Sequence, residues 1–564
     1  MTTAQTGLYN NGTDGAQPVP RGKTLGGTSA MNWMIHNEDS RIQLDIWESI
    51  CNLTGWNWLS LSTAFRESET MFAPPPNEAA DLPYIAANHG SSGPICSIFQ
   101  RSILSLFPDY LEPTLLAAGF QIPEDRNGGE AVGGGFLPLA ICPFNYTRSY
   151  SGSAYTAVED RANLQVITNA QVTKILWQST TGNATASGLQ YISASGITNQ
   201  MLGREVILSA GCIQSAQILE LSGVGDPSVL NPLGIDTVVN LPNVGRGLRD
   251  PPMTNYMPIH FEINTTLTGG EYVQNFIQLE PASKMLSPQD YAGASTWLNT
   301  TPSIPGLEDV QLQIFKELWY TDQPLIELAW QYNTTNVTPY ALVPLSQGSV
   351  HINSIDPLTP PTINPNYNSV NATINGVEVP FDMWFLAKSA QSYTRQLATI
   401  APMSSIVIST DPAWDLPFED YYDLLFQRTG SSQHLTGTNP MLPRSAGGVV
   451  DTNLLVYGTN NVRIVDGSIF PYQPSAHPMG LTYAVAVRAA RLFQGLQDGG
   501  GLTYTELLPA SNASANATAV FSPSAPRSTA SMFTGGSGRA EVQVSFTTAL
   551  LFVTIFLFRA SHIL

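Results

Sequence analysis

The sequence predicts an α/β fold in which helices pack against a ligand-binding sheet. A strand at residues 205–209 runs through a short turn into a helical pattern that closes at Gly223. Strand character returns at residues 348–353 and again at residues 462–466. Strand-turn-helix units beside mixed β segments are typical of α/β domains, and their turns place a helix N-terminus next to a ligand.

Size and charge narrow the class of protein. The chain has 564 residues, enough for two or three domains and a large core. Hydrophobic residues make up 43% and charged residues 12%, so we expect the bulk of the chain to fold. The formal net charge of −19 repels phosphate backbones, which excludes nucleic-acid binding as the main function.

The other elements follow in chain order. Residues 163–177 predict two short strands joined by an Asn-Ala turn. Residues 251–345 are less regular, and we interpret them as a substrate-side region or a set of long excursions. A loop over residues 467–478 precedes a helix over residues 481–496, where apolar side chains recur at helical spacing. Five aromatic residues of the middle region favour core packing over a substrate cage: Trp297, Phe315, Trp319, Tyr320 and Trp330.

Glycosylation sequons are frequent and favour passage through a secretory pathway. They lie at Asn11, Asn52, Asn145, Asn183, Asn264, Asn299, Asn333, Asn336, Asn371, Asn512 and Asn516. The alternative is chance in a chain rich in Asn, Ser and Thr. We therefore expect a glycoprotein that is secreted or held at the cell surface.

The two ends of the chain differ. The first eight residues contain neither a basic stretch nor an apolar stretch, so they contain no signal peptide. Residues 509–540 predict a flexible linker, and an apolar stretch follows at residues 544–558. Small residues, a polar spacer and a hydrophobic tail fit a GPI-attachment signal. A marginal tail anchor is the competing interpretation, and either would attach the protein to a membrane.

The four cysteines are Cys51, Cys96, Cys142 and Cys212. Their spacing forms no metal-binding cluster and no Cys-x-x-Cys pair, so we expect no metal site. One disulfide is compatible with the sequence, for example between Cys96 and Cys142, although spacing alone does not determine the pairing. Cys212 lies in an apolar run and is expected to be a small core residue.

Four segments in chain order carry motifs of small and polar residues. They are PRGKTLGGTSAMNWM (20–34), SAGCIQSAQILELSGVG (209–225), GSVHINSIDPLTPP (348–361) and, within residues 434–480, HLTGT, GGVVD, VDGS and SAHPMG. Together they resemble the glucose-methanol-choline (GMC) family of flavin oxidoreductases, and its fungal aryl-alcohol oxidase and glucose oxidase branch in particular. The resemblance covers roughly residues 5–497.

The resemblance implies FAD as cofactor and names its contacts. Gly26 and Gly27 would let the backbone approach a bulky anionic group, because a Cβ there would clash. Val172 would touch the adenine side through its backbone, and Asp466 with Gly467 would lie near the diphosphate and ribityl chain. The remaining positions that match family contacts are Arg21, Asn32, Trp33, Met34 and Met479.

Two of the seven histidines, His434 and His477, match the family's catalytic positions. Alcohol oxidation removes a hydroxyl proton and moves a hydride from carbon to the flavin. A neutral imidazole can take that proton at working pH, and a second can hold the hydroxyl. The resemblance makes His434 the base and His477 its partner, with the reverse assignment also open.

The implied fold is a GMC-type FAD-binding fold with a Rossmann-like sheet, beside a substrate-binding domain on a mixed or antiparallel sheet. We expect an FAD-binding region at 1–250, a substrate-side region at 251–345, a C-terminal region at 346–500 and the linker and tail at 501–564. The chain lacks the family's Gly-x-Gly-x-x-Gly element. We therefore expect that the reading frame is incomplete or truncated at its N-terminal end. For the chain as written, we expect weak FAD binding or none.

A smaller difference lies in residues 244–250, where Gly247 replaces the family's Asn and Pro251 follows Asp250. This segment lies near the flavin in the family, so the change bears on substrate or oxygen reactivity.

Three functions are compatible with the sequence. The leading one is an FAD-dependent alcohol oxidoreductase that passes electrons to oxygen or to a quinone-type acceptor. The second is a GMC-fold enzyme without redox chemistry, such as a cyclase or dehydratase of secondary metabolism. The third is an inactive, truncated remnant. Reduction of bound flavin by an alcohol distinguishes the first from the other two.

Overall fold

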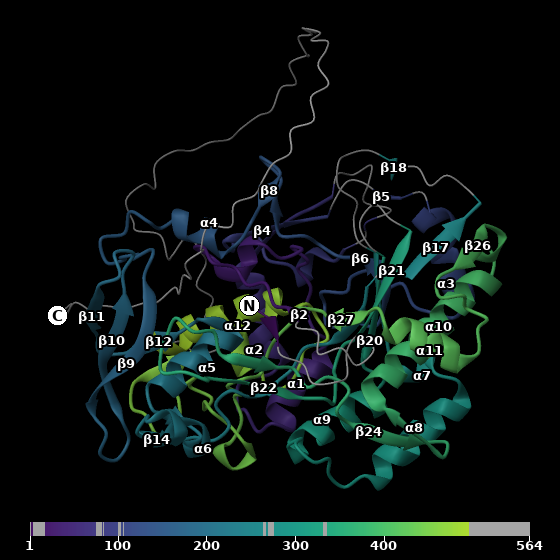
Figure 1. The fold of residues 1–564 in the computed structure, drawn as a ribbon. Helices are drawn as coiled ribbons and strands as arrows, with labels where there is room; N and C mark the ends of the chain where they lie inside the picture. The colour runs from purple at the N-terminus through teal and green to yellow at the C-terminus, as the bar shows by residue number, and fades with distance from the viewer. Residues whose placement is uncertain are drawn as a thin grey trace, which may run out of the picture.

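A large antiparallel sheet and a smaller α/β part organise the chain (Figure 1). The computed structural model describes residues 2–3, 17–74, 82, 84–99, 103–104, 106–255, 257–262, 267–268, 276–330 and 335–495. The tail at 501–564, with its linker and apolar stretch, lies outside the described residues. None of the helices in the described part combines the length and the hydrophobicity that a bilayer crossing requires.

The large sheet has eight strands. Its hydrogen-bonded order is β26 (Val407–Thr410), β17 (Met257–Phe261), β21 (Asn336–Ala341), β20 (Ile326–Trp330), β19 (Phe276–Glu280) and β6 (Gly133–Phe136), with β16 (Pro252–Thr254) pairing both β21 and β27 (Thr429–Ser431). Every residue of β19 and β20 is buried, because the sheet is covered on both faces. The sheet combines strands from three distant parts of the chain.

Register within this sheet fixes which side chains share a face. Glu327 on β20 lies opposite Tyr340 on β21 and opposite Leu279 on β19. Directly opposed residues of an antiparallel pair project from the same face, so Glu327 and Tyr340 point the same way. A slip of β20 by one residue would turn Glu327 to the opposite face of the sheet, away from Tyr340.

The α/β part contains the expected strand-turn-helix unit. Parallel pairs are β12 (Val206–Leu208) with β28 (Val462–Ile464), β3 (Glu69–Phe72) with β4 (Ile95–Ile98), and β13 (Val224–Gly225) with β14 (Val239–Asn240). Helix α5 (Gly211–Leu221) follows β12 and is almost entirely buried. The structure thus confirms the α/β class and the strands expected near residues 205–209 and 462–466.

Helices cover both parts of the molecule. Those around the α/β part are α1 (Arg41–Ser49), α2 (Trp58–Ser68), α4 (Ser151–Thr156), α5, α6 (Pro227–Leu230) and α12 (Pro478–Phe493). Those beside the large sheet, mostly on the right in Figure 1, are α3 (Glu112–Ala117), α7 (Ala282–Met285), α8 (Pro288–Thr300), α9 (Asp309–Tyr320), α10 (Phe381–Thr399) and α11 (Phe418–Phe426). Helix α12 confirms the expected C-terminal helix, although it begins earlier, at Pro478.

Short antiparallel strands complete the described part. They are β9 (Gln171–Ser179), β10 (Thr185–Ile192) and β11 (Thr198–Leu202) in one sheet, β15 (Arg246–Leu248), β22 (Gly348–His351) and β23 (Thr362–Asn364) in another, and the pairs β1 (Thr2–Thr3) with β2 (Gln17–Pro18), β5 (Ile103–Leu104) with β18 (Leu267–Thr268), β7 (Ile141–Cys142) with β8 (Thr147–Arg148), and β24 (Asn371–Ile374) with β25 (Val377–Pro380).

Two expectations from the sequence are wrong. Residues 163–168 form no strand, and the strand begins only at Gln171, because the earlier residues are mostly exposed and pair with no neighbouring strand. The described residues between 251 and 345 are more regular than expected: they supply β16, β17 and β19–β21 of the large sheet and helices α7–α9. Strands β19 and β20 are buried throughout, so neither has the exposed polar face that marks a half-buried strand in a sequence.

The aromatic residues of this region pack in the core, as expected. Trp319 and Trp330 are completely or almost completely buried. The Trp297 ring lies 5.0 Å from the Phe381 ring, and the Trp319 ring lies 6.1 Å from it. Tyr320 is the exception, since 45% of it is exposed. Contacts of this kind favour core packing over a substrate cage.

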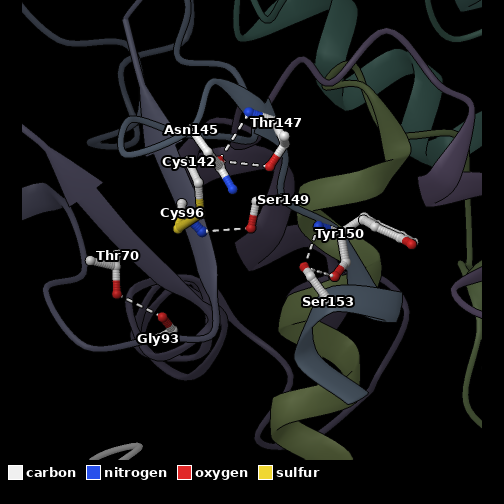
Figure 2. Close-up of a disulfide and its surroundings, with 9 residues drawn as sticks. All are labelled: Thr70, Gly93, Cys96, Cys142, Asn145, Thr147, Ser149, Tyr150 and Ser153. Atoms are coloured by element: carbon white, nitrogen blue, oxygen red, sulfur yellow. Dashed lines mark hydrogen bonds between the residues drawn. A yellow bond between two sulfur atoms is a disulfide. The ribbon is translucent and has the colours of Figure 1, made fainter. Parts of the chain in front are cut away.

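The disulfide considered from the sequence is present in the structure. Cys96 of β4 is bonded to Cys142 of β7, and the Cys96 N–H donates to Ser149 Oγ at 2.9 Å (Figure 2). Cys51 and Cys212 are free and buried. The bridge therefore joins the β3–β4 pair to the β7–β8 hairpin.

Removing this bridge is predicted to destabilise the fold. The two cysteines are 46 residues apart, and closing a loop of that length contributes about 2–4 kcal/mol to the free energy of unfolding. The double substitution Cys96→Ala and Cys142→Ala should lower that free energy in denaturant titration by this amount. In the unfolded wild-type chain, only the Cys51 and Cys212 thiols should react until a reductant is added. Reaction of all four thiols without reductant would contradict the bridge.

Candidate active site

Two histidine rings meet beside the inner strands β20 and β21 of the large sheet. The ring centroids of His434 and His477 lie 4.7 Å apart, with their planes at 67°. The Tyr340 ring of β21 lies 6.3 Å from the His434 ring and nearly parallel to it, and 6.5 Å from the His477 ring. The structure therefore brings together the two histidines singled out in the sequence, beside an aromatic side chain of the sheet.

A buried carboxylate orients His477. The Nε2 atom of His477 lies 3.1 Å from both carboxylate oxygens of Glu327 on β20. Glu327 is almost completely buried. An ionised carboxylate can only accept hydrogen bonds, so the proton of the neutral His477 ring belongs on Nε2. Glu327 thus fixes the orientation of the His477 ring.

A second carboxylate holds the loop that carries His434. The backbone N–H of His434 donates to Asp250 Oδ1 at 2.9 Å, and Ser432 Oγ donates to the same oxygen at 2.7 Å. The other oxygen accepts from the hydroxyl groups of Tyr367 and Ser431. Asp250 is buried. Four donors around one carboxylate leave this loop little freedom.

The loops of the two histidines are also bonded to each other. The N–H groups of Gly437, Asn439 and Met441 donate to the carbonyl oxygens of residues 467, 468 and 469 at 3.2, 2.8 and 2.7 Å. Thr436 Oγ1 donates to Gln473 Oε1 at 2.5 Å. This ladder runs between the two histidine positions, so the loops form one rigid unit.

Burial makes His434 a neutral base. Loss of solvation lowers the pKa of the His434 imidazole well below its usual value, and the neighbouring His477 ring and Arg21 guanidinium act in the same direction. The imidazole is therefore uncharged at neutral pH. An uncharged imidazole can accept a proton, which is the property that a general base requires.

The loop at residues 20–34 lies next to this pair. Arg21 Nη2 donates to the carbonyl oxygen of Gln433 at 3.1 Å, directly before His434. Asn32 Nδ2 lies 2.9 Å from Met479 Sδ, at the start of α12. Met34 has a positive φ of 66°, and its N–H donates to Asn32 Oδ1. Six of the expected cofactor contacts lie on this loop.

The two glycines of this loop have different surroundings: Gly26 is packed against the chain, and Gly27 borders open space. A Cβ on Gly26 would lie 2.6 Å from the Gly152 nitrogen, so the chain itself excludes a side chain there. A Cβ on Gly27 would meet no atom within 4 Å. The backbone at Gly27 therefore borders open space that a ligand can approach closely.

The same loop, residues 20–34, also carries a charged group and exposed apolar side chains. Lys23 Nζ is buried and makes no hydrogen bond within the described residues. Trp33 is 68% exposed and Met31 is 48% exposed. An unpartnered ammonium suits an anionic group, and exposed apolar side chains suit a flat aromatic one.

The remaining expected contacts lie on two elements of the α/β part. Asp466 follows β28, and its carboxylate accepts from the Gly211 N–H at 2.9 Å and from Ser215 Oγ at 2.6 Å. Asp466 thereby holds the N-terminus of α5, with Gly467 beside it. Val172 lies on β9 with its side chain buried in the core.

Several functional residues were missed in the sequence. Glu327 is a charged residue inside the apolar run of β20, and such a residue in a buried strand is a signal that could have found it. Asp250 ends the segment that differs from the family pattern at Gly247. Nothing in the sequence indicated a role for Tyr340 or Lys23, because the role of each depends on contacts between segments that are distant in the chain.

Comparison with known proteins decides the family. The GMC oxidoreductase family models match residues 5–253 and 344–486. The GMC oxidoreductase family protein Mala s 12 of Malassezia sympodialis is 30% identical over 504 residues, which cover 84% of this chain and 80% of that protein. The chain belongs to the GMC oxidoreductase family.

Other proteins similar to this GMC oxidoreductase are consistent with its family membership. The glucose oxidase-like protein fsoC of Humicola fuscoatra is 29% identical, covering 85% of this chain and 83% of that protein. An FAD-dependent oxidoreductase from Chaetomium thermophilum superposes with a TM-score of 0.75 at 24% identity, over 88% and 89% of the two chains. A fungal aryl-alcohol oxidase superposes with a TM-score of 0.71 at 23% identity, over 84% of this chain and 86% of that chain. The last two show likeness of fold.

Members of the GMC oxidoreductase family are generally FAD-dependent oxidoreductases, and the described residues of this chain fit FAD. The weak binding expected from the missing Gly-x-Gly-x-x-Gly element stays a prediction, which the FAD content of the purified wild-type chain tests. The open backbone at Gly27 and the unpartnered Lys23 ammonium suit the diphosphate. The exposed Trp33 side chain suits the flavin ring. Asn32 and Met479, which contact each other, suit the same ring beside the histidines. The family resemblance assigned all of these residues except Lys23.

A matched pair of glycine substitutions tests this assignment. Gly27 and Gly196 both have positive φ, and neither has an atom near the position of a Cβ. Replacing either with alanine costs a similar strain of about 1–2 kcal/mol. Gly27→Ala is predicted to lower the FAD bound per chain well below wild type, and Gly196→Ala to leave it unchanged, as measured by absorbance after gel filtration. Equal FAD content in both variants would contradict the assignment.

Proposed function

We propose that this protein is an FAD-dependent oxidoreductase that acts on the CH–OH group of an alcohol. The observation that carries the proposal is the histidine pair: one ring is desolvated and neutral, and the other is bonded to the buried Glu327. Both rings lie beside the loop that fits the cofactor. Glucose oxidase-like relatives and an aryl-alcohol oxidase of the same fold support an alcohol as substrate.

The residues divide the chemistry between them. His434 accepts the hydroxyl proton, because its neutral ring is the available base. His477 positions the alcohol oxygen, and Glu327 fixes the orientation of the His477 ring for this contact. FAD, when bound, supplies the hydride acceptor. Either oxygen or a quinone-type compound can then act as the final acceptor.

Anaerobic reduction of the flavin tests the proposal. A panel of primary and secondary alcohols added to the purified protein should include one that bleaches the flavin absorbance. His434→Ala is predicted to slow that bleaching by about 10²–10⁴-fold, because a general base contributes this much. Flavin that no alcohol reduces would move the assignment to a non-redox enzyme of the same fold.

The pH dependence of this reduction follows from the environment of His434. Burial lowers the pKa of its imidazole, so protonation blocks the base only in solutions more acidic than the usual imidazole range. The rate constant of flavin reduction should therefore stay level as the pH falls through about 6.5, and decline only below it. A decline centred at or above that pH would contradict the assignment of His434 as a desolvated base.

We further propose that the protein passes through a secretory pathway and carries N-linked glycans. Five of the six sequon asparagines in the described residues are exposed on the folded surface. These five are Asn52, Asn145, Asn183, Asn299 and Asn371. The disulfide also suits an oxidising compartment. The expected membrane attachment through the tail stays a prediction, since the tail lies outside the described residues.

Peptide mapping of protein secreted from a eukaryotic host tests the glycans. Asn145 is the best site to test, because it lies in the hairpin turn beside the disulfide (Figure 2). The preceding residue in the chain, Phe144, is 83% exposed. Enzymatic deglycosylation should convert Asn145 to aspartate in wild type and in Thr147→Ser, and leave it unmarked in Thr147→Ala. Recovery of unmodified Asn145 from the secreted wild-type protein would contradict glycosylation at this site.

A further inference from the structure

Five consecutive polar residues, His36 to Ser40, are buried in this protein. Their exposed fractions are 1%, 2%, 3%, 2% and 4% in chain order. The cofactor loop ends just before them and α1 begins just after them. A buried polar group costs about 1–3 kcal/mol unless it finds a partner, so a run of five requires an explanation.

Two of these side chains hold the backbone next to His477. Asn37 Oδ1 accepts the N–H of His477 itself at 3.0 Å. Asp39 Oδ1 accepts the N–H of Ala476 at 2.8 Å. Asn37 Nδ2 and Asp39 Oδ2 have no hydrogen-bond partner among the described residues. Both side chains thus direct an oxygen to the backbone N–H groups of residues 476–477.

The segment around them is itself held from several sides. The N–H and carbonyl of His36 are bonded to Pro138 and Asn127. Ser40 Oγ donates to Gln323 Oε1 at 2.5 Å, close to the start of β20 and therefore to Glu327. The segment therefore joins the histidine loop to the strand that carries the carboxylate partner of His477.

Helix α12 is seated directly on the same segment. A Cβ added to Gly480, in the first turn of α12, would lie 2.7 Å from the Asn37 carbonyl oxygen. The backbone of Asn37 therefore touches the helix, while its side chain holds the residue that precedes the helix. His477 is the N-cap of α12, so its position is set from both sides.

We propose that Asn37 and Asp39 are positioning residues for the catalytic pair, which place the His477 ring against His434 and Glu327 by holding the backbone of residues 476–477. The proposal rests on the function proposed above. Neither side chain takes part in the reaction. A displacement of about 1 Å in a reacting group can cost 10²-fold in rate, so two such hydrogen bonds matter kinetically.

The test uses variants of Asn37 with a matched control. Asn37→Ala and Asn37→Leu remove the acceptor, and the leucine keeps the volume should the alanine variant fold poorly. Asn37→Asp and Asp39→Asn keep an acceptor at each position. Glu38→Gln is the control, because Glu38 is equally buried and its backbone N–H donates to Asn127 Oδ1 instead of contacting residues 475–477.

The first readout needs no substrate. In protein labelled with ¹³C in the histidine rings, His434→Gln and His477→Gln assign the two resonances of the pair. The His477 resonance should shift in Asn37→Ala and Asn37→Leu, and stay at its wild-type position in Glu38→Gln. His351, which is bonded to Glu220 elsewhere in the fold, serves as the internal reference. A wild-type His477 resonance in both folded acceptor-free variants would overturn the proposal.

The second readout is the rate of flavin reduction by an alcohol. Removal of the acceptor should lower the rate constant about 10–100-fold, while the apparent Kd of the alcohol changes little. Asn37→Asp and Asp39→Asn should restore most of the rate. A parallel loss in Glu38→Gln would mean a general loss of structure and would overturn the proposal. If no alcohol reduces the wild-type flavin, the proposed function fails, and the histidine resonances alone decide the positioning role.

Discussion

The contact between the rings of His434 and His477 is the constraint on which the rest of the structure depends. The two residues lie in different loops, and a centroid distance of 4.7 Å requires both loops to be held. Asp250 holds the first loop through the His434 N–H, and Glu327 holds the ring of His477. Each histidine thus has its own buried carboxylate, one acting on the backbone and the other on the imidazole.

The two parts of the fold contribute different halves of this arrangement. The large sheet supplies Glu327 and Tyr340, and the pairing of β20 with β21 directs both side chains to one face. The α/β part supplies the cofactor loop and α12, whose N-terminal end carries His477. The site therefore forms only where the two parts meet, and its geometry depends on register within the sheet.

How much of this the sequence could predict depends on the kind of contact. Motifs of adjacent residues, such as Gly26-Gly27 and the loops of His434 and His477, were readable because family members share them. Glu327 and Asp250 were not, because their roles arise from contacts with residues distant in the chain. Strands β19 and β20 were missed for another reason: burial on both faces removes the alternation that marks a strand.

Isotope effects on flavin reduction test the central claim most directly, namely that His434 takes the hydroxyl proton while hydrogen leaves the carbinol carbon. The rate constant would be measured with an alcohol deuterated at that carbon, in ordinary water and in deuterated water. The account predicts that carbon deuteration slows reduction in the wild type, and that the solvent effect grows when His434 is replaced. No effect of carbon deuteration on flavin bleaching, with the bleaching step isolated under single-turnover conditions, would contradict it.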